Sequence, residues 1–136
     1  MADDDPTDAR LVEARIRADS ALVAVDNGDT PIAFVVFRPL GEDLYIEQID
    51  VAPAHAGRRI GAALLDAVAA RGRALVLSTF RDIPWNAPWY RRLGFFDVPD
   101  VDLPPLLRQI RNEHVARGLD ESLRVFMKRP AKAAPA

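Results

Sequence analysis

The sequence predicts an α/β domain built on one mixed, mostly antiparallel twisted sheet with flanking helices. Three apolar runs separated by short turns fall within residues 21–51 and predict three antiparallel strands in a row. An apolar run that ends at Val51, a helical stripe over residues 60–71 and a second apolar run at residues 74–77 predict a βαβ unit. Because a βαβ crossover joins parallel strands, we expect this parallel pair at the centre of the sheet.

The length and composition indicate a single soluble domain. The chain has 136 residues, of which 49% are apolar and 28% are charged. A chain of this length can bury about two thirds of its unfolded surface around one core. We expect a disordered tail over residues 1–7, one domain over residues 8–129 and a flexible tail over residues 130–136.

The composition also argues against several classes of function. A formal net charge of −2 is atypical of nucleic-acid-binding proteins, which carry a net basic surface. No apolar run approaches the about 20 residues that a membrane-spanning helix needs. With no cysteine and two isolated histidines, the chain offers no cysteine nucleophile and predicts no metal site. The acidic start lacks the features of a signal peptide, so we expect a cytoplasmic protein.

The first half of the chain predicts one helix and three strands. Helical spacing extends over residues 8–19, and strands are predicted at residues 21–25, 32–37 and 44–51. Asn27-Gly28 predicts a tight hairpin turn between the first two strands, because both residue types tolerate positive φ. The strand at residues 32–37 is apolar on both faces, which predicts a central position in the sheet.

The second half predicts strands that alternate with helices. We expect strands at residues 74–77, 94–98 and 123–127, a short helix at residues 88–93 and a longer one from residue 102 or 103 to residue 117. The apolar face of the longer helix is set by Leu103, Leu107 and Ile110. His114 falls on this same face, so we expect a packed structural histidine there.

The segment from Val51 to Leu65 has the pattern of an anion-binding turn. An apolar strand ends, small residues follow, and a helix begins near Ile60. The first N–H groups of a helix lack backbone partners and carry the positive end of the helix dipole, so a phosphate can bind there. Arginines crowd the middle third of the chain and favour a basic pocket for one small polyanion: Arg58, Arg59, Arg71, Arg73, Arg81, Arg91 and Arg92.

Two motifs resemble those of the acetyl-CoA-dependent N-acetyltransferases of the GNAT superfamily. Val51-Ala52-Pro53 and Gly61 match the superfamily's strand end and phosphate turn. The later motif is matched by Asn86, Tyr90, Arg92, Gly94 and Phe95. The order of strands, helices and motifs agrees over about residues 21–128. The resemblance implies the acyl-CoA N-acyltransferase fold with a shortened N-terminal region, in which the central parallel strands splay apart.

The resemblance implies acetyl-CoA as the cosubstrate and assigns residues to its binding. Backbone N–H groups of the turn, with charge from an arginine, would hold the pyrophosphate, which implicates Gly57, Arg58, Arg59, Ile60, Gly61 and Ala62. Pantetheine would insert between the splayed strands, beside Ile49 and Val51. Asn86 and Tyr90 would also contact the cosubstrate.

The resemblance also implies the catalytic groups. The Val51 N–H would stabilise the oxyanion of the attacked thioester, and Tyr90 would protonate the departing thiolate. A further group must accept the proton of the acceptor ammonium. Glu47 and Asp50 lie on the strand that leads to the reaction centre and point to opposite faces if that strand is regular. We rank Glu47 first, while Asp50 and a water chain stay open because a bulge would change the parity.

The implied function is the transfer of an acetyl group from acetyl-CoA to a primary amine by direct attack in a ternary complex. Thr79, Phe80 and Trp85 are the expected acceptor contacts, and the acceptor is a small-molecule or a peptide amine. A non-catalytic acyl-CoA-binding or regulatory module is the alternative function, and a structural partner that binds no CoA is a third class. We expect no metal, nucleic-acid or membrane partner, and a homodimer stays open.

Overall fold

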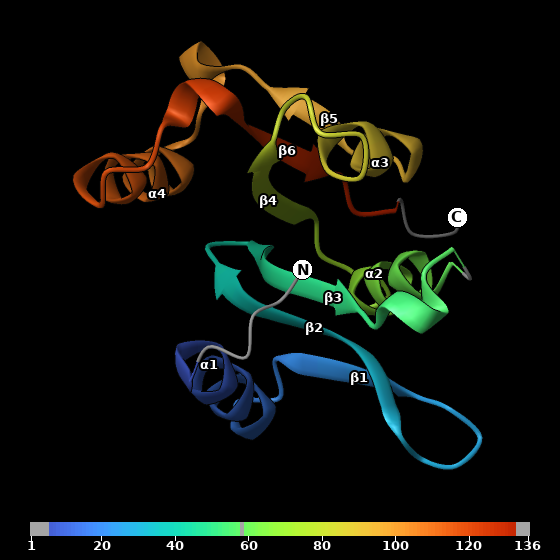
Figure 1. Cartoon of the computed structure of the whole chain (residues 1–136). Coiled ribbons are helices and arrows are strands. Elements are labelled where there is room, and N and C mark those ends of the chain that lie inside the picture. The colour runs from blue at the N-terminus through green and yellow to red at the C-terminus, as the bar shows by residue number, and fades with distance from the viewer. Residues whose placement is uncertain (1–5, 58, 133–136) are drawn as a thin grey trace. The chain divides into compact units, whose positions relative to one another are not determined.

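The computed structural model describes residues 6–57 and 59–132, which fold into two compact units. Residues 1–5 and 133–136 of the expected tails lie outside the described residues, and Pro6 already belongs to the first helix. Figure 1 labels the helices and strands of both units. Unit 1 comprises Met1–Pro39 and Leu44–Gly72, and unit 2 comprises Leu40–Asp43 and Arg73–Ala136.

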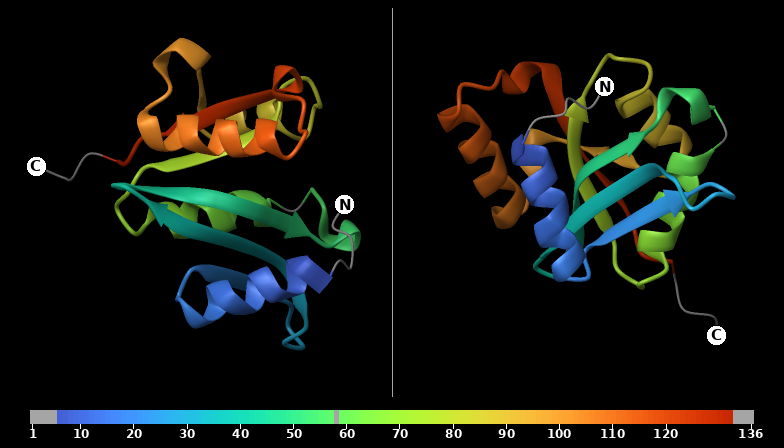
Figure 2. Two further views of the ribbon diagram at one scale, coloured as in Figure 1. Left: turned by 90° about the vertical axis from the view of Figure 1, so that its left-hand side faces the viewer. Right: turned by 60° about the horizontal axis from the view of Figure 1, so that its bottom comes forward.

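Unit 1 holds three strands that lie between two helices, as the two views of Figure 2 show. The strand order is β1-β2-β3, and β1 pairs antiparallel with β2, with Leu22 opposite Val35. β2 is therefore the middle strand of this unit, as its apolar residues on both faces predict. The elements are α1 (Pro6–Arg17), β1 (Ala21–Val25), β2 (Pro31–Leu40), β3 (Asp43–Val51), a 3₁₀ turn (Pro53–His55) and α2 (Ile60–Ala69), with the strand ends Leu40 and Asp43 counted in unit 2.

The core of unit 1 comes from β2 and from one face of α2. Val35, Val36 and Phe37 on β2 are fully buried. The buried residues of α2 follow the predicted helical stripe: Gly61, Ala62, Leu64, Leu65 and Val68. Arg71 follows α2, places its guanidinium 4.9 Å from the centre of the Phe37 ring and donates to the carbonyl of Asp19 at 3.0 Å. This arginine therefore anchors the end of the helix segment.

The turn between β1 and β2 differs from the prediction. Asn27 and Gly28 both have negative φ, and the left-handed residue is Asp29, at φ 62°. The cause is the Asp26 side chain, whose Oδ1 accepts hydrogen bonds from the N–H groups of Gly28 at 2.8 Å and Thr30 at 3.0 Å. The predicted hairpin turn is therefore present, but an aspartate-anchored turn that ends in a left-handed residue replaces the expected positive φ at Asn27 and Gly28.

Unit 2 holds three antiparallel strands in the order β4-β6-β5. In this register Met127 of β6 lies opposite Leu77 of β4 and Asp97 of β5. β4 runs to Phe80 and is longer than the predicted strand at residues 74–77. The elements are β4 (Leu75–Phe80), α3 (Ala87–Arg92), β5 (Phe96–Val98), a 3₁₀ turn (Asp100–Asp102), α4 (Pro105–Ala116), a 3₁₀ turn (Glu121–Leu123) and β6 (Arg124–Arg129).

The core of unit 2 forms from β4, β6 and one face of α4. The buried side chains are Leu75, Val76 and Leu77 on β4, Val125, Phe126 and Met127 on β6, Leu107 and Ile110 on α4, and Leu103 just before α4. His114 of α4 stacks on the Phe126 ring at 6.2 Å between ring centres, and its Nδ1 lies 2.9 Å from Glu121 Oε1. His114 is thus a packed structural histidine, as its place on the apolar face predicts.

Arg73 holds the turn between β2 and β3 within unit 2. Its guanidinium donates to the carbonyl oxygens of Gly41 at 2.7 Å, Glu42 at 2.8 Å and Asp43 at 3.0 Å. Because three charge-assisted hydrogen bonds on a half-buried group are lost together, Arg73→Ala is expected to lower the free energy of unfolding by about 2 kcal/mol. Urea denaturation measures this loss, and Arg73→Lys, which keeps the charge without the fork of donors, should recover only part of it. Unchanged stability of Arg73→Ala would contradict the anchoring role.

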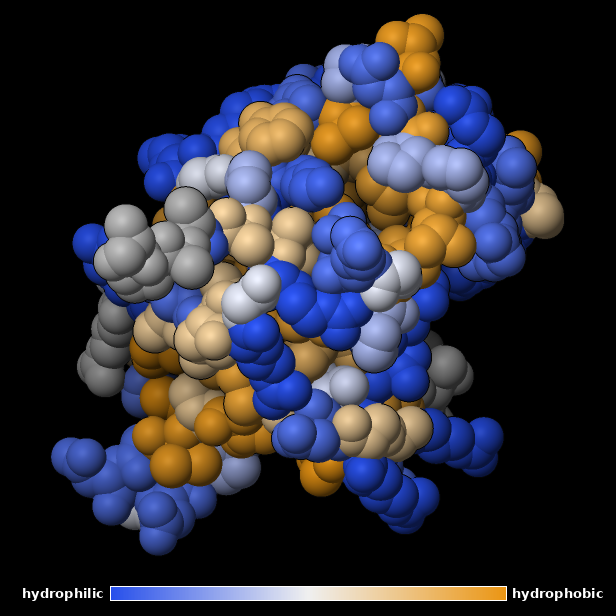
Figure 3. Space-filling model, turned by 180° about the vertical axis from the view of Figure 1, so that it is seen from behind, coloured by the Kyte–Doolittle hydropathy of each residue, from blue (hydrophilic) through white to orange (hydrophobic). Residues whose placement is uncertain are grey.

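Large apolar side chains are exposed on both units. Trp85 is 73% exposed and Val101 is 86% exposed. Figure 3 shows one face of the molecule, where apolar side chains lie in separate groups among hydrophilic ones. Within the residues that the structure describes, no helix is both long and apolar enough to cross a membrane. Self-association through one of these apolar groups stays a prediction, which sedimentation velocity tests.

Candidate active site

The corner between β3 and α2 in unit 1 is the predicted phosphate turn. Gly57 has φ 85°, and Arg59, the residue that precedes α2, adopts the left-handed conformation at φ 60°. No side chain of the described residues caps the start of α2, and its first turn contains no acidic residue. The N–H groups at the start of this ten-residue helix are therefore available to an external anion. Arg58 lies outside the described residues.

The backbone of Arg59 is strained, because a residue with a side chain is less stable at positive φ by about 1 kcal/mol. We expect Arg59→Gly to relieve this strain and to raise the free energy of unfolding by about 0.5 kcal/mol, after the greater freedom of glycine in the unfolded chain is subtracted. Urea denaturation measures the change. Arg59→Lys, which keeps both charge and strain, should leave stability unchanged, and a loss of stability in the glycine variant would contradict the strain.

Val51 lies at the end of β3 and directs its N–H away from β2. The next residue, Ala52, donates its N–H to the carbonyl of Ile32 at 2.8 Å and so faces β2. Successive N–H groups of an extended chain point to opposite edges, so the Val51 N–H points to the other edge of β3. Ile49 and Val51 are half-buried. The Val51 N–H is therefore directed away from β2, and its role as the oxyanion donor stays a prediction.

Glu47, the first-ranked proton acceptor, is held by two arginines of unit 1. Both carboxylate oxygens accept hydrogen bonds from the Arg15 guanidinium on α1, with Arg15 Nη2 at 2.9 Å from Oε2. Arg38 Nε lies 3.6 Å from the same Oε2. The Glu47 carboxylate, 16% exposed, also raises the pKa of the Arg15 guanidinium, chiefly through this hydrogen bond. Nothing in the spacing of residues 8–19 indicates that α1 would supply this partner.

Asp50 lines a cavity that we call the α1 cavity, whose volume is about 560 Å³. Glu47 contacts α1 through Arg15, and Asp50 borders a cavity whose wall includes Val12 and Glu13 of α1. The two carboxylates thus have different surroundings, since Glu47 is paired with arginines and Asp50 borders a cavity. The cavity is lined by Val12, Glu13, Val23, Pro31, Ile32, Ala33, Phe34, Asp50 and Ala52, all of unit 1.

Tyr90 of α3 is the predicted acid in unit 2. Its side chain packs edge-on against Trp89 and Phe95, with ring centres at 4.9 Å and 5.4 Å. The residue is 7% exposed, and this burial raises the pKa of the Tyr90 phenol to about 12. The phenol is thus protonated throughout the neutral range, which a proton donor requires.

The other predicted contacts of unit 2 surround the end of β4 and the start of α3. Asn86 precedes α3, but its side chain forms no capping hydrogen bond within the described residues. Thr79 is buried on β4, Phe80 is 40% exposed, and Trp85 stands open in the following loop. Arg124 of β6 braces this strand end, because its guanidinium lies 5.0 Å from the Phe80 ring centre and donates to Ser78 Oγ at 3.1 Å.

Several arginines of the middle third have hydrogen-bond partners within their own unit. Besides Arg71 and Arg73, Arg81 donates to the Arg124 carbonyl at 2.9 Å, and Arg91 forms a two-bond pair with Asp97, each bond 2.9 Å long. Backbone carbonyls and carboxylates thus occupy these guanidinium groups. If an anion binds at the turn before α2, we therefore expect backbone donors to hold it more than a cluster of side chains.

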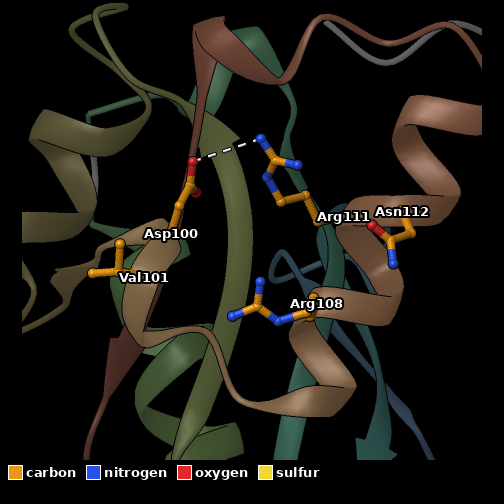
Figure 4. Close-up of a pocket in the computed structure, with 5 residues that line it drawn as sticks. All are labelled: Asp100, Val101, Arg108, Arg111 and Asn112. Atoms are coloured by element: carbon orange, nitrogen blue, oxygen red, sulfur yellow. Dashed lines mark ion pairs between the residues drawn. The ribbon is translucent and has the colours of Figure 1, made fainter.

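Unit 2 contains a hollow of about 330 Å³, and none of the predicted site residues lines it. Figure 4 shows its lining side chains, with the Arg111 guanidinium directed at the Asp100 carboxylate across 3.6 Å. Arg108 donates to the carbonyl of Leu103 at 3.4 Å. The lining residues are Asp100, Val101, Arg108, Arg111 and Asn112.

Comparison with known proteins identifies the family. The family model described as the acetyltransferase (GNAT) family matches residues 2–95, which is more than half of the chain. The chain belongs to the GNAT acetyltransferase family. The match covers β3, the turn before α2 and the Tyr90 segment, so the GNAT motifs found in the sequence lie inside it.

Solved structures show the same fold. The chain is 26% identical to nourseothricin acetyltransferase, with a TM-score of 0.60. The match covers 82% of this chain and 65% of the nourseothricin acetyltransferase chain. It resembles a GNAT-family acetyltransferase from Staphylococcus aureus Mu50 with a TM-score of 0.69 and 18% identity, over 97% of this chain and 81% of that one. An aminoglycoside 6′-N-acetyltransferase complexed with coenzyme A gives a TM-score of 0.66 and 17% identity, over 97% and 84% of the two chains. The predicted mixed α/β fold of the GNAT acetyltransferases is confirmed.

Proposed function

We propose that this GNAT chain transfers the acetyl group of acetyl-CoA to a primary amine by direct attack in a ternary complex. The observation that carries the proposal is the corner after β3, where an uncapped helix start follows two left-handed residues, Gly57 and Arg59. A pyrophosphate at this corner is supported because the first turn of α2 has no acidic residue and no side chain of the described residues caps it. Coenzyme A bound to an aminoglycoside acetyltransferase of the same fold supports the choice of cosubstrate.

The predicted residues keep their proposed roles in this reaction. Val51 donates its N–H to the carbonyl oxygen of the thioester as the amine nitrogen bonds to the carbonyl carbon. Tyr90 donates its phenolic proton toward the sulfur as the carbon–sulfur bond breaks and the sulfur keeps the bonding pair. Ile49, Arg58, Ile60, Gly61, Ala62 and Asn86 complete the proposed cosubstrate contacts, and Thr79, Phe80 and Trp85 the proposed acceptor contacts.

The proton lost by the acceptor ammonium goes to a carboxylate of β3 or to water. Glu47 stays a candidate, but its two oxygens already accept hydrogen bonds from Arg15, so a proton transfer there must disrupt that pair. Asp50 borders the α1 cavity next to Val51 and forms no ion pair with another described residue. These contacts favour Asp50, directly or through a water molecule.

A thiol-release assay with acetyl-CoA and a panel of amines tests the proposal. The panel contains arylalkylamines, polyamines, aminoglycosides, amino acids and peptides with free N-termini. Release of CoA that depends on an amine, with the acetyl amide found by mass spectrometry, is the expected result. Binding of CoA by calorimetry without release for any amine would favour the non-catalytic acyl-CoA-binding module. Absence of CoA binding would contradict both functions.

A further inference from the structure

We propose that the α1 cavity selects acceptor amines that have an apolar body and carry no carboxylate. The inference rests on the proposed function, because the cavity is lined by Asp50 and Ala52, the two neighbours in sequence of Val51, which is the proposed oxyanion donor. All of its walls belong to unit 1, so its composition is fixed by α1 and the three strands β1, β2 and β3. Its volume of about 560 Å³ lies within the range of ordinary small-molecule sites.

The walls of the α1 cavity are mainly apolar. Val12 comes from α1, Val23 from β1 and the run Pro31–Phe34 from β2. Val23 is 44% exposed, although it pairs with Phe34 in the interior of the β1–β2 ladder. A ligand with an aromatic or aliphatic body would remove this valine and its neighbours from water, which favours binding in proportion to the apolar area covered.

The charge of the α1 cavity has one sign. Glu13 and Asp50 are its charged lining residues, and neither forms an ion pair with another residue that the structure describes. Two arginines of the same unit, Arg15 and Arg38, pair with the Glu47 carboxylate instead. The cavity therefore attracts an ammonium group and repels a carboxylate.

This charge pattern discriminates between two kinds of primary amine. An arylalkylamine places its ammonium near Asp50 and its ring against the apolar walls. The matching α-amino acid adds a carboxylate two bonds from the nitrogen, where it meets Asp50 with no positive lining residue to balance it. Repulsion of the amino-acid carboxylate thus contributes to the selectivity as much as attraction of the arylalkylamine ammonium does.

The kinetic test compares tryptamine with tryptophan at saturating acetyl-CoA. We expect kcat/KM for tryptamine to exceed that for tryptophan at least tenfold in the wild type. Glu13→Gln, which removes an exposed carboxylate from the cavity rim, should narrow this ratio at least threefold. Glu113→Gln is the matched control, because Glu113 is an exposed glutamate of α4 that does not line the cavity, and it should leave the ratio unchanged.

Calorimetry of tryptamine binding separates this inference from the proposed function. Val23→Trp fills the cavity and should raise the dissociation constant of tryptamine at least tenfold, and Glu13→Gln should raise it at least threefold. Turnover that prefers tryptophan would overturn the inference and leave the acetyltransferase function standing. Tryptamine binding that both variants weaken, without turnover of any amine, would support the cavity and contradict acetyl transfer. Tryptamine affinity unchanged in both variants would overturn the inference.

Discussion

Replacement of Tyr90 by phenylalanine is expected to lower kcat by about 10²-fold and to leave the dissociation constant of CoA nearly unchanged. The phenol is buried against Trp89 and Phe95, and phenylalanine keeps those ring contacts. The substitution therefore removes the hydroxyl and little else. Single-turnover kinetics with acetyl-CoA, beside calorimetry of CoA binding, measures the two quantities, and unchanged turnover would remove Tyr90 as the proton donor.

The raised pKa of Tyr90 gives this variant a second signature. A folded-state pKa of about 12, against about 10 in the unfolded chain, leaves the phenol neutral in both states below pH 10. Above pH 10 the unfolded chain loses this proton first, so the free energy of unfolding falls by about 1.4 kcal/mol per pH unit until the folded pKa is passed. Tyr90→Phe should lack this part of the loss. Urea denaturation of both proteins between pH 9 and pH 11.5 measures the difference, which would be absent if the phenol were solvated.

A donor of such high pKa also limits the kind of acid catalysis that Tyr90 can provide. An ordinary thiol has a pKa of about 8.5, so complete proton transfer from the Tyr90 phenol to a free thiolate is uphill by about 3.5 pKa units. The phenol can still stabilise the charge that develops on sulfur through a strong hydrogen bond. We therefore expect no inflection from Tyr90 in the pH–rate profile below pH 10.

The fold could be predicted from the sequence because its elements have distinct periodicities. α2 and β2 show why, since the four-residue stripe of α2 indicates a helix, and the short, β-branched and aromatic run of β2 between turn residues indicates a buried strand. The position of the β1–β2 turn was predicted, but its backbone conformation was not, because the Asp26 side chain outcompetes the intrinsic preference of Asn27-Gly28 and such a local hydrogen bond leaves no periodic signal. Turn chemistry is thus less predictable than strand and helix position in this chain.

The parts of the candidate site that short motifs encode can be read from the sequence. The turn at Gly57 and the Tyr90 segment are each a short stretch of chain, and their resemblance to GNAT motifs singles them out. The pairing of Glu47 with Arg15 joins residues 32 positions apart, and the α1 cavity joins three strands to a helix. These contacts depend on how α1 packs on the strands, which periodicity predicts only as a buried face.

Asp50→Asn is expected to lower turnover, whereas Glu47→Gln is expected to lower stability. This difference identifies which of the two carboxylates accepts the proton. If Asp50 accepts the proton, Asp50→Asn lowers kcat by about 10²-fold and flattens the acidic limb of the pH–rate profile. Glu47→Gln leaves Arg15 and Arg38 without their carboxylate in a partly exposed site, so it should lower the free energy of unfolding by about 2 kcal/mol. Stopped-flow turnover and urea denaturation of both variants measure the two effects.

A double-mutant cycle with Arg15→Ala separates a structural role of Glu47 from a catalytic one. If Glu47 mainly anchors α1, Arg15→Ala and Glu47→Gln destabilise the protein by less together than the sum of their separate effects, with a coupling of about 1 kcal/mol. Both variants should then lose turnover to a similar extent, because each releases α1 from β3. If Glu47 accepts the proton instead, Glu47→Gln loses turnover about 10²-fold while Arg15→Ala retains most of it, since the freed carboxylate is still present to take the proton.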